Sequence, residues 1–380
     1  MCCDCRKIDL NGLMMDGGII DNYAILQDAL AGGDCTVLLP PGRFLVSRTL
    51  KVFSNTKIIA GNNTVIRLAA NTGKRFDDWL LTNADHDKGN SNIEISGGIW
   101  DVNGKENPRG EREKLDDYGG VGIYFLRMSQ LVLQNITVSN PDSFFIMICE
   151  TAVFRIENVQ LFNDNPKINQ DGVHVGGFCR DGLIRGLRAI SPMTPGDDLV
   201  ALNANDGVAH FTHGQKPGPI ENIVIEDLYA DSAYAFVRLL SQDQPIRNIR
   251  IKNAQGGVRN NFLNVNRWRF EPGGGNISDI KVSDVAVHKM PWSVPEPKIN
   301  EAPLCDINLK VHNFVIENFQ RNMLDNSVGD TFQVDMGVPC EVEYVPEQCG
   351  KDIEIEKGVD NKIKTCRLRD GGFKYLAINL

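Results

Sequence analysis

Alternating apolar positions recur along the chain in short segments, each followed by a polar or glycine corner and a second apolar strand. Within a segment, hydrophobic residues occupy every second position, as at Ile93 and Ile95, whereas a helical repeat would show a period of 3.6. The positions that correspond from copy to copy are Ile95, Leu133, Ile156, Ile184, Ile225, Ile251, Val282 and Val311. Subtraction gives intervals of 38, 23, 28, 41, 26, 31 and 29 residues. Strands at such intervals predict the coils of a β-solenoid interrupted by loops.

A right-handed parallel β-helix is the all-β architecture that this pattern favours. A β-propeller would need about four strands in every 40–50 residues, whereas each interval here holds two or three. The longest aperiodic excursion, 101–119, is a charged loop. Loops on one face of a solenoid commonly build its binding site.

The two ends of the chain depart from the repeat and predict caps. Residues 1–50 contain a helical pattern from Asp21 to Leu30, stopped by Gly32 and Gly33, and then two strands around a Pro-Pro-Gly turn. We expect this segment to close one end of a solenoid formed by residues 51–320. After Phe319 the repeat fades, and strand-like runs at 340–345 and 352–356 predict a small C-terminal β cap over 321–380.

Two acidic segments run directly into alternating apolar residues and so predict turns that lead into half-buried strands. The first is Asn169-Gln170-Asp171-Gly172-Val173-His174-Val175, and the second is Gly196-Asp197-Asp198-Leu199-Val200-Ala201-Leu202. Their first aspartates are 26 residues apart (197 minus 171), about one coil. On neighbouring coils they would lie ~5 Å apart. Asp171, Asp197 and Asp198 would then crowd one patch, which is costly unless the patch has a function.

Composition narrows the classes of partner. The chain has 49 acidic and 40 basic residues, which argues against nucleic acid and anionic membranes, since both reward clustered Lys and Arg. No apolar run is long enough to span a membrane. The N-terminus lacks the apolar core of a signal peptide, so the chain is either intracellular or has lost a leader. The ten cysteines show no zinc-ligand spacing, and we expect neither a metal nor a cofactor.

The paired acidic segments resemble those of the polygalacturonase-like glycoside hydrolases of family 28. In that family the first segment is Asn-Thr-Asp-Gly-Ile-His and the second is Gly-Asp-Asp-Cys-Ile-Ala. The N-terminal helix, strand and Pro-Pro-Gly turn also resemble the entry to the family's pectin-lyase-like fold. The similarity covers roughly residues 15–320.

The resemblance implies hydrolysis of a glycosidic bond with inversion, the acid and base being supplied by Asp171, Asp197 and Asp198. Inversion needs one protonated carboxyl beside the leaving oxygen and one carboxylate that activates water across the sugar ring. Carboxyls on adjacent coils raise one another's pKa, which keeps one of them protonated. By position we expect Asp198 to be the acid, with Asp171 and Asp197 holding the water. The resemblance also implies that the substrate is an oligosaccharide or polysaccharide, pectin-related or from another plant or bacterial source.

Candidate substrate contacts depart from the family's pattern. The family places Gly-His-Gly on its next coil and Arg-Ile-Lys on the one after. Here the histidines that follow, His210 and His213, lie in a loop, and a plain loop residue is the alternative to a substrate contact for His213. Arg238 alternates with buried neighbours and is either a substrate-facing cation or a solvated side chain. Arg250-Ile251-Lys252 matches by letters only, because it falls in the repeated strand. A neutral sugar is therefore as plausible as galacturonate.

The remaining candidates also admit plainer interpretations. Asp and Asn at solenoid corners often only satisfy turn backbone, which applies to Asn169 and to Asn203, two further candidate substrate contacts. His174 is either a substrate contact or a packing residue. Two other functions stay open: a lyase or epimerase on the same fold, in which Asp197 and Asp198 could bind Ca²⁺, and a non-catalytic glycan-binding or structural β-helix like a phage tail. Oligomeric state is undetermined.

Overall fold

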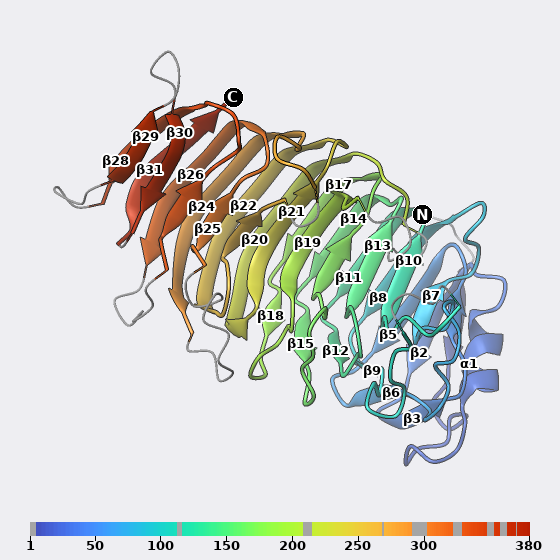
Figure 1. Cartoon of the computed structure of the whole chain (residues 1–380). Coiled ribbons are helices and arrows are strands. Elements are labelled where there is room, and N and C mark those ends of the chain that lie inside the picture. Colours follow the sequence, from blue (N-terminus) through green and yellow to red (C-terminus); the bar gives the residue numbers. More distant parts are fainter. Residues whose placement is uncertain are drawn as a thin grey trace.

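Strands of successive coils pair in parallel along most of the chain in the computed structural model of the protein (Figure 1). The structure describes residues 5–111, 116–207, 215–267, 270–290, 302–321, 329–347, 353–357, 363–369 and 371–380. The predicted right-handed parallel β-helix is confirmed. None of the helices in these ranges is long and apolar enough to cross a membrane.

The first face of the coil is a parallel ladder that runs the length of the molecule. It corresponds to the repeat found in the sequence, since Ile95, Leu133, Ile156, Ile184, Ile225, Ile251 and Val282 are register partners in turn. Its strands are β1 (Arg6–Asp9), β2 (Cys35–Leu39), β5 (Thr56–Ala60), β8 (Asn90–Ser96), β11 (Met128–Gln134), β14 (Ala152–Glu157), β17 (Cys179–Arg185), β20 (Ile220–Ala233), β22 (Ile246–Val258), β24 (Ile277–Lys289) and β26 (Val311–Arg321).

The last register position differs from the prediction. Val282 pairs with Ile316, and Val311 pairs instead with Ile277. Asn308-Leu309-Lys310-Val311 has the same Asn-apolar-x-apolar spacing as the true copy, Asn313-Phe314-Val315-Ile316, so periodicity alone selected the wrong one.

A second ladder forms the adjacent face, and further along the chain the two faces merge in long continuous strands. β20 shows this directly, because its first half pairs with β17 and its second half with β18. The second-face strands are β3 (Gly42–Val46), β6 (Thr64–Leu68), β9 (Ile99–Asp101), β12 (Thr137–Ser139), β15 (Gln160–Phe162) and β18 (Arg188–Ala189).

The third face, which we call sheet B, carries the candidate site. Its parallel strands are β4 (Leu50–Val52), β7 (Leu81–Asn83), β10 (Ile123–Leu126), β13 (Ile146–Cys149), β16 (Val173–Val175), β19 (Asp198–Asn205), β21 (Ala235–Ser241), β23 (Leu263–Val265), β25 (Cys305–Ile307) and β27 (Phe332–Val334). Inward residues of all three faces, such as Val200, Ile225 and Val237, are completely buried and form one continuous core. Each such aliphatic side chain contributes about 1.5–3 kcal/mol of transfer free energy.

Asparagine and aspartate occupy the corners because the chain turns there through the left-handed region. Asn222, Asn248 and Asp279 have φ values of 57°, 54° and 55°, a conformation that these residues tolerate better than other non-glycine types. Their side chains also bond from coil to coil, as Asn248 Nδ2 donates to Asn222 Oδ1 at 2.8 Å. A corner residue thus satisfies the local backbone geometry and links neighbouring coils.

Both ends of the core are covered. At the N-terminal end, helix α1 (Tyr23–Leu30) buries Leu26, Ala29 and Leu30 against the first coils. At the C-terminal end the pairing becomes antiparallel, which ends the parallel coil: β31 (Phe373–Asn379) pairs with β26 and β28 (Glu341–Pro346), while β30 (Ile363–Leu368) pairs with β27 and β29 (Ile353–Lys357). Phe319 and Phe373 stack with centroids 5.1 Å apart inside this cap.

Candidate active site

The two acidic segments lie on adjacent coils of sheet B. β16 pairs with β19 so that Val173 faces Val200 and His174 faces Ala201. The carboxylates of Asp171, Asp197 and Asp198 each place one oxygen within 4.8 Å of the other two. The structure therefore brings together the three aspartates that the sequence singled out.

Glycine permits the close approach of these segments. A Cβ on Gly172 would lie 2.5 Å from the Leu199 carbonyl oxygen, and one on Gly196 would lie 1.6 Å from that of Lys167. Backbone hydrogen bonds then hold the segments together, since Gly172 N donates to Asp198 O at 2.8 Å. The glycine in each segment is thus a packing requirement.

Asp198 is a deeply buried carboxyl whose charge is poorly compensated. Its side chain is 4% exposed, and its Oδ1 has no hydrogen-bond partner among the described residues. Burial, followed by the charges of Asp197 and Asp171, raises the pKa of this carboxyl well above its usual value, and Arg238 opposes the shift only in part. A protonated Asp198 would have an O–H to donate.

His174 is held between two acceptors. Its Nδ1 lies 2.6 Å from Asp171 Oδ2 and its Nε2 lies 3.1 Å from Gln215 Oε1. The amide orientation of Gln215 follows from its Nε2, which donates to the Asn203 carbonyl at 2.6 Å. Both ring nitrogens must then donate, so the ring is an imidazolium. Burial alone would lower the pKa of His174, but the hydrogen bond and charge of Asp171 raise it overall.

Asn203 and Arg238 lie on the same face, further along sheet B. Asn203 is 4% exposed, and its Nδ2 lies 3.4 Å from Asp206 Oδ2. Arg238 follows Ala201 in register and donates to Asn266 Oδ1 at 3.0 Å. Arg250 and Lys252, in contrast, lie on β22 of the first face, outside sheet B.

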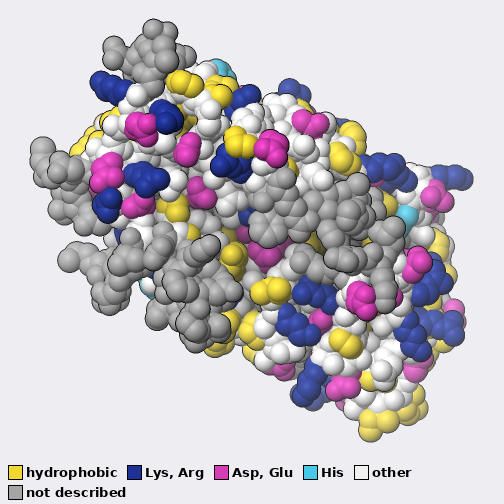
Figure 2. All heavy atoms as spheres, viewed as in Figure 1, with side chains coloured by type: hydrophobic (Ala, Val, Ile, Leu, Met, Phe, Trp, Pro, Cys, Tyr) yellow, Lys and Arg dark blue, Asp and Glu magenta, His cyan; other side chains and the backbone are white. Residues whose placement is uncertain are grey.

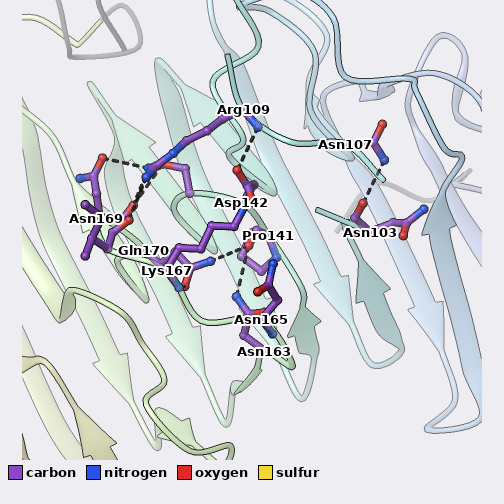
Figure 3. Close-up of polar contacts among 12 residues, drawn as sticks. Asn103, Asn107, Arg109, Pro141, Asp142, Asn163, Asn165, Lys167, Asn169 and Gln170 are labelled. Carbon is purple, nitrogen blue, oxygen red and sulfur yellow. Dashed lines mark hydrogen bonds and ion pairs between the residues drawn. The ribbon is translucent and has the colours of Figure 1, made fainter. Parts of the chain in front are cut away.

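Asn169 is engaged by a residue from the charged excursion. Arg109 donates to the Asn169 Oδ1 at 3.3 Å and to the Ile168 carbonyl at 3.0 Å (Figure 3). Asn169 is therefore tied to the protein in this structure. His213, the remaining candidate, lies outside the described residues.

Three supporting residues were not found from the sequence. Gln215 and Arg109 lie in loops whose composition gives no sign of their contacts. Arg259 is 3% exposed and donates to the carbonyls of Ser232, Met193 and Pro195 at 2.9, 3.1 and 2.8 Å. It thereby supports the turn that precedes Asp197, and burial lowers its pKa to about 10.

Charges are mixed over the surface. In Figure 2, lysine and arginine side chains are interspersed with acidic ones on the face shown. The chain as a whole has a net charge of −9. Neither feature resembles the clustered positive charge that binds nucleic acid.

The chain is similar in sequence to plant polygalacturonases, at low identity. No protein-family profile matches the chain. A polygalacturonase of Gossypium hirsutum is 21% identical over 221 residues, which cover 56% of this chain and 48% of that protein. A polygalacturonase of Gossypium barbadense matches to the same extent. The matched region thus spans about half the length of these curated relatives.

Solved structures agree over a larger part of the chain. The family 28 exopolygalacturonase of Yersinia enterocolitica matches with a TM-score of 0.53 and 14% identity, covering 83% of this chain and 72% of that one. A hyperthermoactive exopolygalacturonase of Thermotoga maritima gives 0.55 and 13%, covering 87% and 89%. A tailspike protein of E. coli bacteriophage HK620, in complex with a pentasaccharide, gives 0.55 and 12%, covering 83% and 62%. The chain therefore has the polygalacturonase-like, pectin-lyase-like fold.

Proposed function

We propose that this chain is a glycoside hydrolase that cleaves an oligosaccharide or polysaccharide, pectin-related or from another plant or bacterial glycan. The observation that carries the proposal is Asp198, a buried carboxyl whose pKa is raised by burial and by two flanking carboxylates. A carboxyl kept protonated beside ionised carboxylates has the properties of a general acid. The polygalacturonase names among the similar proteins support this assignment.

In the proposed reaction, Asp198 donates its proton to the glycosidic oxygen as the bond from that oxygen to the anomeric carbon breaks. Asp171 and Asp197 hold a water molecule, which loses a proton to one of them and adds its oxygen to the anomeric carbon. The net change is the addition of one water across the bond. His174, bonded through Nδ1 to Asp171, holds that carboxylate in a fixed orientation.

The stereochemical outcome depends on where the water lies. The closest oxygens of the three carboxyls are within 4.8 Å, shorter than the ~6.5–9.5 Å common in inverting pairs and nearer the ~5–5.5 Å of retaining ones. We nevertheless propose inversion, because a third carboxyl leaves two groups to hold water once Asp198 is the acid. The anomeric configuration of the first product, followed by NMR, decides between the two.

The surroundings of Arg238 bear on whether the substrate is charged or neutral. Arg238 could pair with a uronate carboxylate, as the names of the similar proteins suggest. However, Arg238 is bonded to Asn266, whose Nδ2 in turn lies 3.3 Å from Asp306 Oδ2. Asp306 interacts electrostatically with Arg238, although burial raises the pKa of the Asp306 carboxyl. Because Arg238 is already engaged in this way, neutral glycans belong in the same screen as polygalacturonate.

The test is the release of reducing sugar from polygalacturonate, rhamnogalacturonan and neutral glycans by the native chain and by Asp198→Asn. Asp279→Asn is a matched control, because Asp279 is an exposed corner residue in a position where neighbouring coils carry asparagine. We expect activity in the native chain and the control and a loss of about 10²-fold or more in Asp198→Asn. Equal activity in all three proteins would contradict the proposed role of Asp198.

A non-catalytic glycan-binding β-helix is the second candidate, favoured by the similarity to a tailspike in complex with a pentasaccharide. A binder would retain glycan affinity in Asp198→Asn and would release no reducing sugar as the native protein. Folded native protein that is inactive on the whole panel but binds one of its glycans would support this candidate.

A further inference from the structure

A second apolar cluster lies on the outer side of sheet B, next to the candidate active site. Tyr124 on β10 and Met147 on β13 alternate with the inward residues Ile123 and Ile146 of the main core. The outward cluster consists of Trp79, Val121, Tyr124, Leu126, Phe144, Met147 and Cys149, all less than 10% exposed. Outward positions of a solenoid are normally solvated, so a buried apolar layer here means that other segments cover it.

This layer extends up to the proposed catalytic residues. The ring of Phe144 stacks on His174 with centroids 4.5 Å apart and an angle of 6°, and Met147 is the register partner of His174. One coil further away, Trp79 stacks on Tyr124 at 4.8 Å. The outer surface of sheet B on the β10–β13 side of Asp171 is therefore covered by protein side chains.

Two excursions border the layer and are joined to each other. Asn107, in the excursion after β9, accepts hydrogen bonds through Oδ1 from the backbone of Thr72 and Gly73, at 2.8 and 2.9 Å. Phe76 N also donates to Asp116 O at 3.2 Å. Trp79 lies in the excursion between β6 and β7 (residues 69–80), and Val121 lies at the end of the excursion between β9 and β10, of which residues 102–111 and 116–122 are described. These described segments and the apolar layer form one structure, which we call the wall.

Arg109 connects the wall to the segment that carries Asp171. Its guanidinium donates to Asn169 Oδ1 and to the Ile168 carbonyl. Its backbone N–H donates to Asp142 Oδ2 at 2.9 Å, and the same carboxylate is paired with Lys167 (Figure 3). Asp142 is 3% exposed. Because Arg109 bonds through its charged guanidinium to this segment and through its backbone to the buried Asp142, the wall is held against the site.

On the opposite side of the site, over β21–β25, sheet B presents polar and partly exposed side chains instead of a buried apolar layer. In register beyond His174 and Ala201, sheet B presents Arg238, Asn264 and Asp306. Arg238, Asn266 and Asp306 are partly exposed. Their guanidinium, amide and carboxylate groups match the hydroxyls of a sugar, which both donate and accept hydrogen bonds.

From this asymmetry we propose that the wall closes the active site on the β10–β13 side, so that substrate extends only across β21–β25 and the protein removes units from the end of a glycan chain. This inference rests on the proposed hydrolase function. The wall leaves the chemistry of the bond unchanged and determines which bonds can reach Asp198. A chain lying along the sheet would meet the wall beyond His174, where Phe144 and the outer layer fill the space, whereas a chain end would fit.

The test uses the native full chain and oligogalacturonides and xylo-oligosaccharides of graded length, labelled at the reducing end. Products are resolved by size at the earliest measurable times. We expect each chain length, at the earliest times, to give one short fragment of fixed size and one chain shortened by that size, with the label on one of the two. Several fragment sizes appearing together from a single chain length would overturn the end-acting proposal and leave the hydrolase function intact. Absence of hydrolysis across both series and the wider glycan panel, in folded protein, would overturn both.

Two variants connect the product pattern to the wall. Trp79→Ala removes a ring of the outer layer, and Arg109→Ala removes the connection to Asn169 without emptying the apolar cluster. If either variant folds, we expect the product pattern to shift from a single size to a mixture. Phe162→Ala, which truncates an exposed aromatic residue on the second face, should keep the native pattern. A native pattern in both folded wall variants would contradict the role given to the wall.

Discussion

His174 donates through Nδ1 to Oδ2 of Asp171 over 2.6 Å, and the same ring lies flat against Phe144. The two contacts fix the orientation of a proposed catalytic carboxylate. A residue that acts through Asp171 is a positioning residue, and its loss should affect the chemical step more than substrate binding.

His174→Ala should therefore lower kcat by about 10²-fold with a smaller change in KM, because small displacements of a reacting group are costly. His174→Gln can still donate one hydrogen bond to Asp171 and should retain part of the activity. Steady-state kinetics of the two variants provide the measurement. A loss confined to KM would assign His174 to substrate binding.

Asp198→Asn should stabilise the protein while removing its activity. A carboxyl with a raised pKa binds its proton more tightly in the folded state, so the free energy of unfolding falls as pH rises from the unfolded pKa of about 3.9 towards the folded value. Each pKa unit by which the folded value exceeds the unfolded value corresponds to about 1.4 kcal/mol of free energy. An amide has no such proton to lose. Thermal unfolding at neutral and acidic pH should show a higher Tm at neutral pH and a flatter pH dependence for the variant.

Activity should fall as pH rises, for the same reason. The proposed reaction needs Asp198 protonated, and the pKa of this group is raised by burial and by Asp197 and Asp171. His174 has a raised pKa too, so its contribution to stability is present below about 6.5 and is lost as pH rises through its folded value. A pH–rate profile of kcat checks the alkaline limb. In His174→Gln, kcat should still fall at high pH, because the loss of the Asp198 proton remains.

Chelation of divalent cations should leave activity unchanged. The three aspartates could in principle hold a cation, but Asp171 is already paired with His174, and the raised pKa of Asp198 disfavours the ionised form that a cation needs. A Ca²⁺-dependent lyase would instead lose activity in EDTA and would form an unsaturated product. Measuring reducing-sugar release and ultraviolet absorbance with and without EDTA separates the two.

Arg259→Met should destabilise the protein by about 3 kcal/mol. Two buried carbonyls and one half-buried carbonyl would lose their donor, at roughly 1 kcal/mol for each hydrogen bond. Arg250→Met, at an exposed arginine of the first face, is the matched control and should change the free energy of unfolding by less than about 0.5 kcal/mol. Denaturant unfolding of both variants measures the difference. Equal effects would mean that Arg259 has no special role in supporting the Asp197 turn.

Local alternation of apolar and polar residues is enough to determine the architecture of this chain. Ile95, Leu133 and Ile156 could be aligned because a buried ladder needs an apolar residue at the same point of every coil, and the corners needed Asn, Asp or Gly for their backbone geometry. The same local rule selected Val311 in place of Ile316, because both follow an asparagine at the same spacing.

The sequence also indicated that Asp171, Asp197 and Asp198 would meet, since a separation of one coil becomes a neighbouring position when strands pair in parallel. It suggested Asp198 as the acid by position alone, and it did not indicate that His174 would be charged. The raised pKa of Asp198 depends on burial, and the charge of His174 depends on contacts such as that with Gln215. Arg109 supports the turn before Asp171 from a loop, and Arg259 supports the turn before Asp197 from another coil. Such contacts have no periodic signature, so only the tertiary structure decided them.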